Sequence, residues 1–178
     1  MKVLFFVLLL NGTNLFNVFS QESINCDALK YWDGKMYLTG ENTPYQGKCI
    51  SYYESNQKRK EESYTEGVVN GLSSGWYLTG QLSFEANYKD GDLHGFVKGW
   101  YDNGQQKEEG SYLFGLMTGE WTWWHNNGKI KMKGAFKGGK MVGKWIEWDN
   151  KEIVIKEAKY IDGKKMEGEK IKYPISYY

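Results

Sequence analysis

The residues best suited to proton transfer are glutamates that recur in one column of the sequence. Glu61, Glu85, Glu109 and Glu157 are separated by 24 or 48 residues, and Lys133 occupies the remaining position. General acid–base catalysis needs two carboxylates in different environments, whereas equivalent positions of a repeat provide equivalent environments. We therefore interpret the column as solvated charge that pairs with lysines on neighbouring strands.

The two histidines stand at positions that other repeats fill with unrelated residues. His94 replaces Gln, Asn, Thr or Val, and His125 replaces Tyr or Asp. Two histidines are too few for a histidine-based triad or a zinc site. The glycine-rich turns lack the Gly-Lys-Ser/Thr sequence and the following helix of a phosphate loop. The sequence predicts no catalytic residues, no metal and no cofactor, and therefore a protein that is not an enzyme.

Aromatic side chains are the residues of this sequence best suited to binding. The candidate contact residues are the column Tyr52, Trp76, Trp100, Trp124 and Trp148, together with Trp121, Trp123 and Trp145, which crowd two neighbouring repeats. Aromatic clusters are enriched in protein interfaces and binding hot spots. The alternative is that these rings only pack a thin sheet, and the sequence leaves both interpretations open.

The spacing of these residues indicates an array of 24-residue repeats. Two glycine columns keep the same spacing: Gly47, Gly71, Gly95, Gly119 and Gly143, and Gly67, Gly91, Gly115, Gly139 and Gly163. Columns that recur without an insertion are typical of repeat proteins. Two turn signals per repeat leave two strands of about six to eight residues. The predicted fold class is all-β: an antiparallel β-meander of tandem 24-residue hairpin repeats that forms an elongated, twisted single sheet.

Turn dipeptides and alternating residue types place the strands within each repeat. Asn103-Gly104 and Asn127-Gly128 predict type I′ turns, in which both central residues have positive φ. Apolar and polar residues alternate in the second strand of each repeat, which predicts one apolar face. In four of the five repeats a small residue precedes the Tyr or Phe of that strand by two positions and would let a large neighbour, such as a Trp, lie across it: Ala86, Gly110, Gly134 and Ala158.

The two ends of the chain depart from the repeat. Residues 1–20 have the short apolar run and small final residue of a secretory signal peptide; the alternative is a buried N-terminal strand. We expect residues 21–46 to form a capping segment with a partial repeat. Residues 47–168 contain five repeats and the start of a sixth, and residues 169–178 form a C-terminal tail that covers the last strand.

Charge and cysteine content narrow the choice of partner and compartment. Without the signal peptide the net charge is 0, which argues against a nucleic-acid partner. Residues 21–128 carry a net charge of −6 and residues 129–178 a net charge of +6. This difference indicates either random sequence variation on solvated faces or a charge asymmetry that steers head-to-tail association of chains. Cys26 and Cys49 form a disulfide in an oxidising compartment or remain as two free thiols.

These motifs resemble the MORN repeat, in particular its bacterial variant. The best matches are the segments 88–105 and 119–128, and the resemblance covers residues 45–168. It implies the hairpin-repeat fold predicted above. It also implies a scaffold for protein contacts, a link to membrane phospholipids, or the antitoxin-like label that similar proteins carry.

The sequence therefore favours a secreted or periplasmic, cell-envelope protein that serves as a protein-binding scaffold. The first alternative is a glycan-binding or anionic-lipid-binding module with peripheral contact to the envelope or membrane surface. The second is an antitoxin-like or immunity protein. The partner and the oligomeric state are left open by the sequence.

Overall fold

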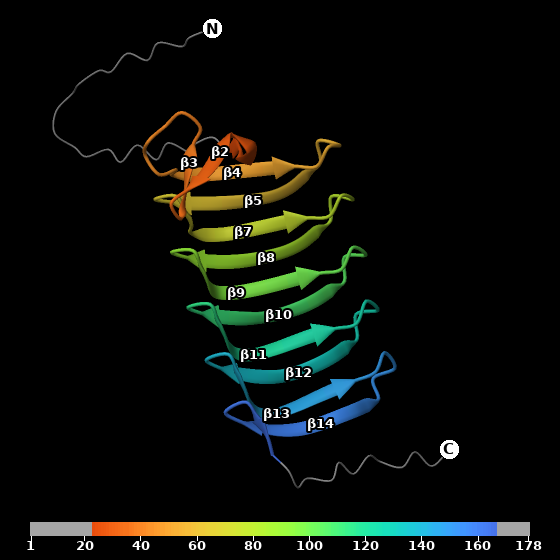
Figure 1. Ribbon diagram of the computed structural model, residues 1–178. Helices are drawn as coiled ribbons and strands as arrows, with labels where there is room; N and C mark the ends of the chain where they lie inside the picture. Colours follow the sequence, from red (N-terminus) through yellow and green to blue (C-terminus); the bar gives the residue numbers. More distant parts are fainter. Residues whose placement is uncertain (1–22, 167–178) are drawn as a thin grey trace, which may run out of the picture.

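The computed structural model of the protein describes residues 23–166. The predicted signal peptide, the sixth repeat beyond residue 166 and the C-terminal tail lie outside these residues. Within them the chain forms one long sheet of 13 strands and a separate two-stranded sheet. Figure 1 shows the strands of the long sheet stacked in chain order from β4 to β14, with a steady twist. The predicted fold class is confirmed.

Each repeat contributes one hairpin, and consecutive hairpins pair with each other antiparallel. The strands of the repeats are β4 (Gly47–Tyr52), β5 (Lys58–Thr65), β6 (Val68–Val69), β7 (Gly71–Trp76), β8 (Leu82–Lys89), β9 (Asp92–Trp100), β10 (Gln106–Leu113), β11 (Leu116–Trp124), β12 (Ile130–Lys137), β13 (Lys140–Trp148), β14 (Val154–Ile161) and β15 (Lys164–Lys165).

The segment before the first repeat folds into a cap. It comprises β1 (Ile24–Asn25), the 3-10 turn η1 (Cys26–Ala28), and the hairpin of β2 (Leu29–Trp32) and β3 (Lys35–Leu38). Strand β1 pairs parallel with β4, which is an exception to the antiparallel order. A disulfide joins Cys26 to Cys49, whose Cα atoms are 4.9 Å apart.

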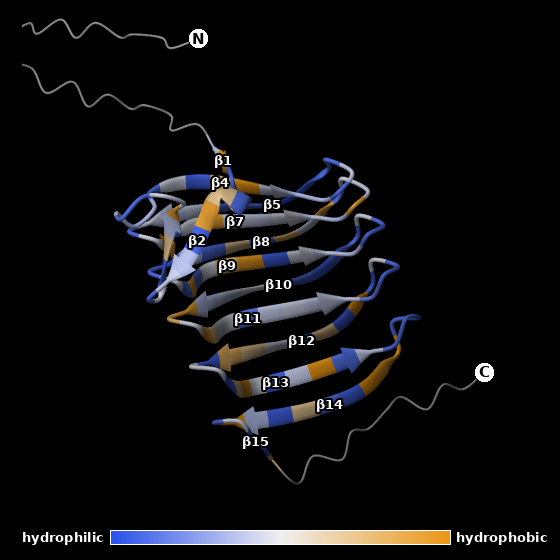
Figure 2. Ribbon diagram, turned by 45° about the horizontal axis from the view of Figure 1, so that its top comes forward, coloured by the Kyte–Doolittle hydropathy of each residue, from blue (hydrophilic) through white to orange (hydrophobic). Residues whose placement is uncertain are grey.

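The cap covers one face of the first repeat. Buried Tyr45, Cys49 and Tyr64 pack there against cap residues that include Leu29 and Met36. We call this side of the sheet the cap face, and the opposite side, which carries the Tyr52–Trp148 column, the ladder face. Figure 2 shows hydrophobic and hydrophilic residues mixed along the strands, as expected for a sheet whose alternate residues point to opposite faces.

The predicted close approach of tryptophans to small residues is confirmed. A Cβ atom added to Gly110 would lie 2.1 Å from the ring of Trp121, and one added to Gly134 would lie 2.1 Å from the ring of Trp145. These indole rings therefore lie directly against the backbone of the neighbouring strand, where a side chain would displace them. The indole rings thus reach close packing against the backbone of their own sheet and need no second sheet or helix over them.

The turn types differ from the sequence prediction. At the edge that carries the loops between the two strands of a repeat, Gly104 has φ 82° but Asn103 does not have positive φ. The amide of Gly104 donates to the carbonyl of Tyr101 at 2.9 Å, and the Asn103 side chain accepts from the Gln105 amide at 3.0 Å. The loop is therefore a four-residue turn with one left-handed glycine, and the prediction of a type I′ turn here was wrong.

The type I′ turns lie at the opposite edge, which we call the turn edge (left in Figure 1). Here two residues join one repeat to the next, and both have positive φ, as in Asp90 (52°) and Gly91 (90°). Only a turn of this twist joins two strands with two residues without splaying them apart.

Candidate functional site

The structure does not bring the eight candidate aromatic residues together. On the cap face the ring of Trp123 contacts the rings of both Trp121 and Trp145. Trp124 directly follows Trp123 in β11, so its side chain belongs to the opposite face. Trp148 lines a shallow depression on the ladder face with Lys144 and Ile146. The eight candidate residues therefore lie on two surfaces of the sheet, because residues of odd and even number in one strand point apart.

The cap-face residues form a continuous aromatic cluster over β10 to β14. Trp121 and Trp123 stack with ring centroids 5.3 Å apart, and Trp123 lies 5.9 Å from Trp145. Three further rings meet these indoles edge-on, the geometry that their quadrupoles favour. The cluster consists of Tyr112, Trp121, Trp123, Phe136, Trp145 and Tyr160.

The three indoles of the cluster differ in exposure and in hydrogen bonding. Trp121 is 2% exposed and Trp145 is 5% exposed, whereas Trp123 is half-buried. The Nε1 atoms of Trp121 and Trp123 donate at 3.2 Å to the carbonyl of Ser111 and the carboxylate of Glu108. Trp123 therefore presents an oriented ring to solvent, with Trp121 and Trp145 as its rigid support.

The ladder-face column is held by a second series of contacts. The hydroxyl of Tyr77 donates to the carbonyl of Trp100 at 2.8 Å, and the same bond joins Tyr53 to Trp76 and Tyr101 to Trp124. This hydrogen-bond ladder fixes the loop of one repeat to the next. These bonds use the backbone carbonyls of the column residues, so they order the loops without depending on the indole rings.

His125 takes the place of tyrosine in this ladder. Its Nε2 atom lies 2.9 Å from the carbonyl oxygen of Trp148, so Nε2 carries the proton and donates it. His94, at the other position singled out in the sequence, packs edge-on against Phe114 with ring centroids 5.0 Å apart. Both histidines therefore vary a structural position, and residues 23–166 contain no group of His, Cys, Asp or Glu side chains that could hold a metal ion.

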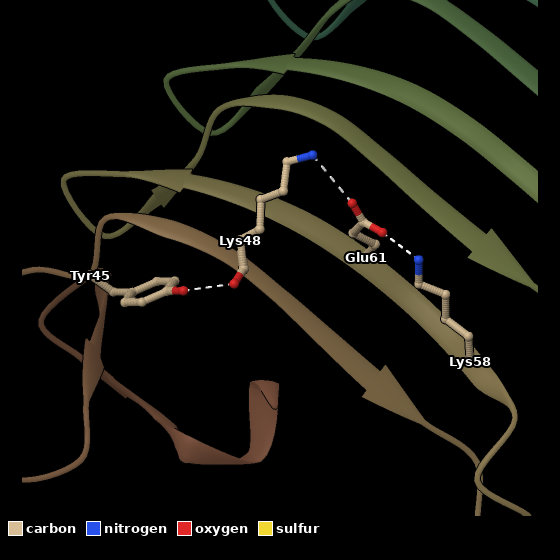
Figure 3. A network of polar contacts seen from close by, with 4 residues as sticks. All are labelled: Tyr45, Lys48, Lys58 and Glu61. Atoms are coloured by element: carbon tan, nitrogen blue, oxygen red, sulfur yellow. Dashed lines mark hydrogen bonds and ion pairs between the residues drawn. The ribbon is translucent and has the colours of Figure 1, made fainter. Parts of the chain in front are cut away.

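Three glutamates of the column, Glu61, Glu109 and Glu157, form ion pairs with lysines on the ladder face. Figure 3 shows Glu61 between Lys48 and Lys58, beside the hydrogen bond from the Tyr45 hydroxyl to the Lys48 carbonyl. The hydrogen bond from Lys58 holds the pKa of the Glu61 carboxyl below its usual range. Glu157 likewise pairs with Lys144 at 2.7 Å. The interpretation of the column as cross-strand charge pairs is confirmed at these positions.

One exposed site was missed in the sequence. In the turn between β10 and β11, Leu113, Phe114 and Leu116 are 48%, 66% and 52% exposed. Phe114 has φ 50°, in the left-handed region. The sequence could have indicated this site, because the residues equivalent to Phe114 in the other turns are charged or glycine: Glu66, Asp90, Gly138 and Asp162.

Comparisons with known proteins agree with the repeat architecture. The model of the MORN repeat variant matches residues 45–66, 69–90 and 117–137. The starts of these matches keep the 24-residue spacing of the columns. No curated protein matches the chain.

Among solved structures, the crystal structure of a GtfA/B complex bound to UDP and GlcNAc shares 12% identity with a TM-score of 0.25. The match covers 60% of this chain and 21% of that one, so this chain spans about a fifth of its length. No helix within residues 23–166 is long and apolar enough to cross a bilayer. The family match and the hairpin array together show that the chain contains MORN repeats of the variant type.

Proposed function

We propose that this MORN-repeat protein is a secreted, non-enzymatic scaffold that binds another protein through the aromatic cluster of the cap face. The observation that carries the proposal is the position of Trp123. The other repeats place Ser51, Gly75, Gly99 and Glu147 at the equivalent position. The fold therefore does not require an indole there, and the chain nevertheless holds one partly exposed on rigid aromatic support.

The cap shows what a complementary surface on this face achieves. At the first repeat, cap residues pack against Tyr45 and Tyr64 and leave them only 6% and 7% exposed. No comparable segment within residues 23–166 packs over the aromatic cluster of repeats 3 to 5. A rigid aromatic platform gains large contact area for little loss of conformational entropy when a partner covers it. An apolar partner surface fits this platform.

The polar groups beside the aromatic cluster restrict the orientation in which a partner can bind. Glu108 accepts the hydrogen bond from Trp123, and Glu147 and Lys156 face each other across β13 and β14. A partner with an apolar anchor flanked by hydrogen-bond donors therefore fits the surface best. The charged groups around the platform stay more solvated than the rings. The apolar anchor of the partner therefore carries most of the binding energy.

A matched pair of substitutions tests the proposal. Trp123→Ser copies the residue of the first repeat on the cap face, and Trp100→Ser removes an indole of the ladder face. After affinity capture from the native envelope fraction and purification of the captured protein, calorimetry gives its dissociation constant for each variant. Trp123→Ser should weaken binding by about tenfold or more, the effect of a hot-spot residue. Equal binding by the Trp123→Ser variant and the unchanged protein would reject the cap face as the contact surface.

Export is the second part of the proposal. The Cys26–Cys49 disulfide supports an oxidising compartment, since such bonds are rare in the cytosol. Cell fractionation with mass spectrometry should find the protein outside the cytosol, with Gln21 as its first residue. A protein that keeps residue 1 and remains in the cytosol would contradict export and would revive the antitoxin role that the resemblance implies.

The charge distribution favours one alternative function. Residues 129–178 carry a balance of +6, which attracts anionic lipids or acidic glycans near a membrane surface. Sedimentation with anionic vesicles or polysaccharide at low and high salt separates this alternative from protein binding. Salt-sensitive sedimentation that survives Trp123→Ser would favour the alternative.

A further inference from the structure

The turn edge offers an internal comparison of five equivalent turns. Three of them carry Asp or Gly at the first turn position, which suits a left-handed backbone, and a fourth carries a charged Glu. The turn of residues 113–116 instead reads Leu-Phe-Gly-Leu, and it is exposed. The five first positions are Glu66, Asp90, Phe114, Gly138 and Asp162.

Phe114 is unfavourable at this position for two reasons. Its φ of 50° costs a residue with a bulky side chain about 1–2 kcal/mol. Its ring is 66% exposed although it contacts His94 on one side. Local strain and exposed apolar surface are both features of contact sites, and three apolar residues in one turn are more than the fold needs.

The charges on either side of this turn have opposite sign. The preceding turn, residues 89–92, contains Asp90 and Asp92 and has a balance of −1. The following turn, residues 137–140, contains Lys137 and Lys140 and has a balance of +2. The edge therefore runs from acidic through apolar to basic, and the pattern continues the −6 and +6 balances of residues 21–128 and 129–178.

An edge of this kind is complementary to itself. A two-fold axis perpendicular to the sheet at Phe114 places the two Phe114 rings together. The same axis places the acidic turn of each copy against the basic turn of the other, because adjacent repeats are about 10 Å apart on both copies. A parallel arrangement would instead set like charges against each other.

We propose that the turn edge is a self-association surface, on which a second copy of this chain docks antiparallel about Phe114. The contact is isologous, so the same patch serves both copies. Three turns per copy bury less than the ~800 Å² per partner of a standard interface, so the dimer is weak and depends on concentration. This surface lies away from the cap face, and the dimer would therefore present two partner-binding platforms.

Cysteine cross-linking tests the two-fold geometry. With the native disulfide intact, Phe114→Cys should form a covalent dimer with a short bifunctional thiol reagent, and Leu78→Cys, an exposed apolar residue of the opposite edge, should not. Asp90→Cys and Gly138→Cys should each give no covalent dimer alone and should cross-link when mixed. A covalent homodimer of Asp90→Cys, or the absence of any cross-link through residue 114, would overturn the proposal.

Sedimentation equilibrium provides a second test with a variant that suits the turn. Phe114→Asp copies Asp90 and Asp162, so it should fold at least as stably as the unchanged chain. Phe114→Asp should abolish dimerisation, whereas Leu78→Asp should leave the dimer intact. High salt should weaken the dimer of the unchanged chain. A dimer that persists in Phe114→Asp would refute the proposal. So would an unchanged chain that is monomeric at every concentration, whether or not it binds neutral vesicles through Phe114.

Discussion

Substitution of Gly134 by Ala tests the packing of tryptophan against backbone on the cap face. The added methyl carbon would lie 2.1 Å from Cδ2 and 2.3 Å from Cε2 of Trp145. Gly134 is not among the glycines with positive φ, so its backbone conformation itself accepts alanine. Without a clash, Gly→Ala at such a position stabilises a protein by about 0.4–1 kcal/mol through the unfolded state. A gain in the free energy of unfolding would therefore indicate no clash with Trp145, and a loss would indicate a clash.

The magnitude follows from the rigidity of the site. Trp145 is held by Trp123 at 5.9 Å and by Phe136 at 4.9 Å, so its ring cannot move aside without displacing both. Overpacking of a well-packed site costs about 1–3 kcal/mol. We predict that Gly134→Ala lowers the free energy of unfolding by about 3 kcal/mol.

A compensating substitution isolates the cause. Two repeats earlier, the chain pairs Ala86 with Val97 instead of a glycine with a tryptophan. Trp145→Val alone should cost about 3 kcal/mol as a large-to-small change. The double variant Gly134→Ala/Trp145→Val copies the earlier pair, so its loss should be smaller than the sum of the two single losses by about 2 kcal/mol.

Urea unfolding followed by far-ultraviolet circular dichroism provides the measurement, with the disulfide kept oxidised. Ala86→Gly serves as the control and should cost about 0.5–1 kcal/mol, the ordinary loss for glycine in a strand. A Gly134→Ala variant that is as stable as the unchanged protein, or losses that simply add in the double variant, would refute the packing described here.

Three further predictions concern a turn, a tyrosine and the disulfide. Glu152→Gly should raise the free energy of unfolding by about 1 kcal/mol in urea titrations, because Glu152 has φ 71° and its ion pair with Lys129 is exposed; a loss of stability would contradict the strain. Burial, followed by the charge of Glu62, raises the pKa of the Tyr64 hydroxyl above its ordinary value of 10.0. The folded state therefore holds this proton more tightly, so stability is full below about pH 10 and falls as the pH rises further; alkaline unfolding curves of Tyr64→Phe should fall less steeply, and an unchanged slope would count against the burial. Replacement of Cys26 and Cys49 by Ser should cost about 3 kcal/mol and increase hydrogen exchange in β1 and the cap hairpin before the later repeats; uniform exchange along the array would show that the bond does not act on the cap.

The fold could be predicted from the sequence because a repeat imposes the same geometry on each copy. The five positions of each glycine column needed no tertiary information, and the match of the small residues at Gly110 and Gly134 to tryptophans followed from strand alternation. The turn types were assigned to the wrong edge because an Asn-Gly dipeptide suits both a type I′ turn and a longer loop with one left-handed glycine. The hydrogen bond from the Gln105 amide to the Asn103 side chain favours the longer loop, and composition does not reveal it.

The candidate site could be predicted only in part. The aromatic residues were found, but Trp123 and Trp124 were grouped as one set of candidates although neighbours in a strand point to opposite faces. The sequence itself shows the two faces, because within β11 and β13 the cap-face tryptophans have odd residue numbers and the ladder-face tryptophans have even ones. The role of Phe114 was missed because a single apolar turn becomes unusual only when its backbone conformation and its exposure are known.

Oxidative footprinting of the protein in complex with its captured partner tests most directly whether the cap face is the contact surface. Mass spectrometry then reports the oxidation rate of each tryptophan with and without the partner. The proposed contact predicts strong protection of Trp123, while Trp100 and Trp148 of the ladder face react as in the free protein. Protection of those two ladder-face tryptophans with no change at Trp123 would contradict it.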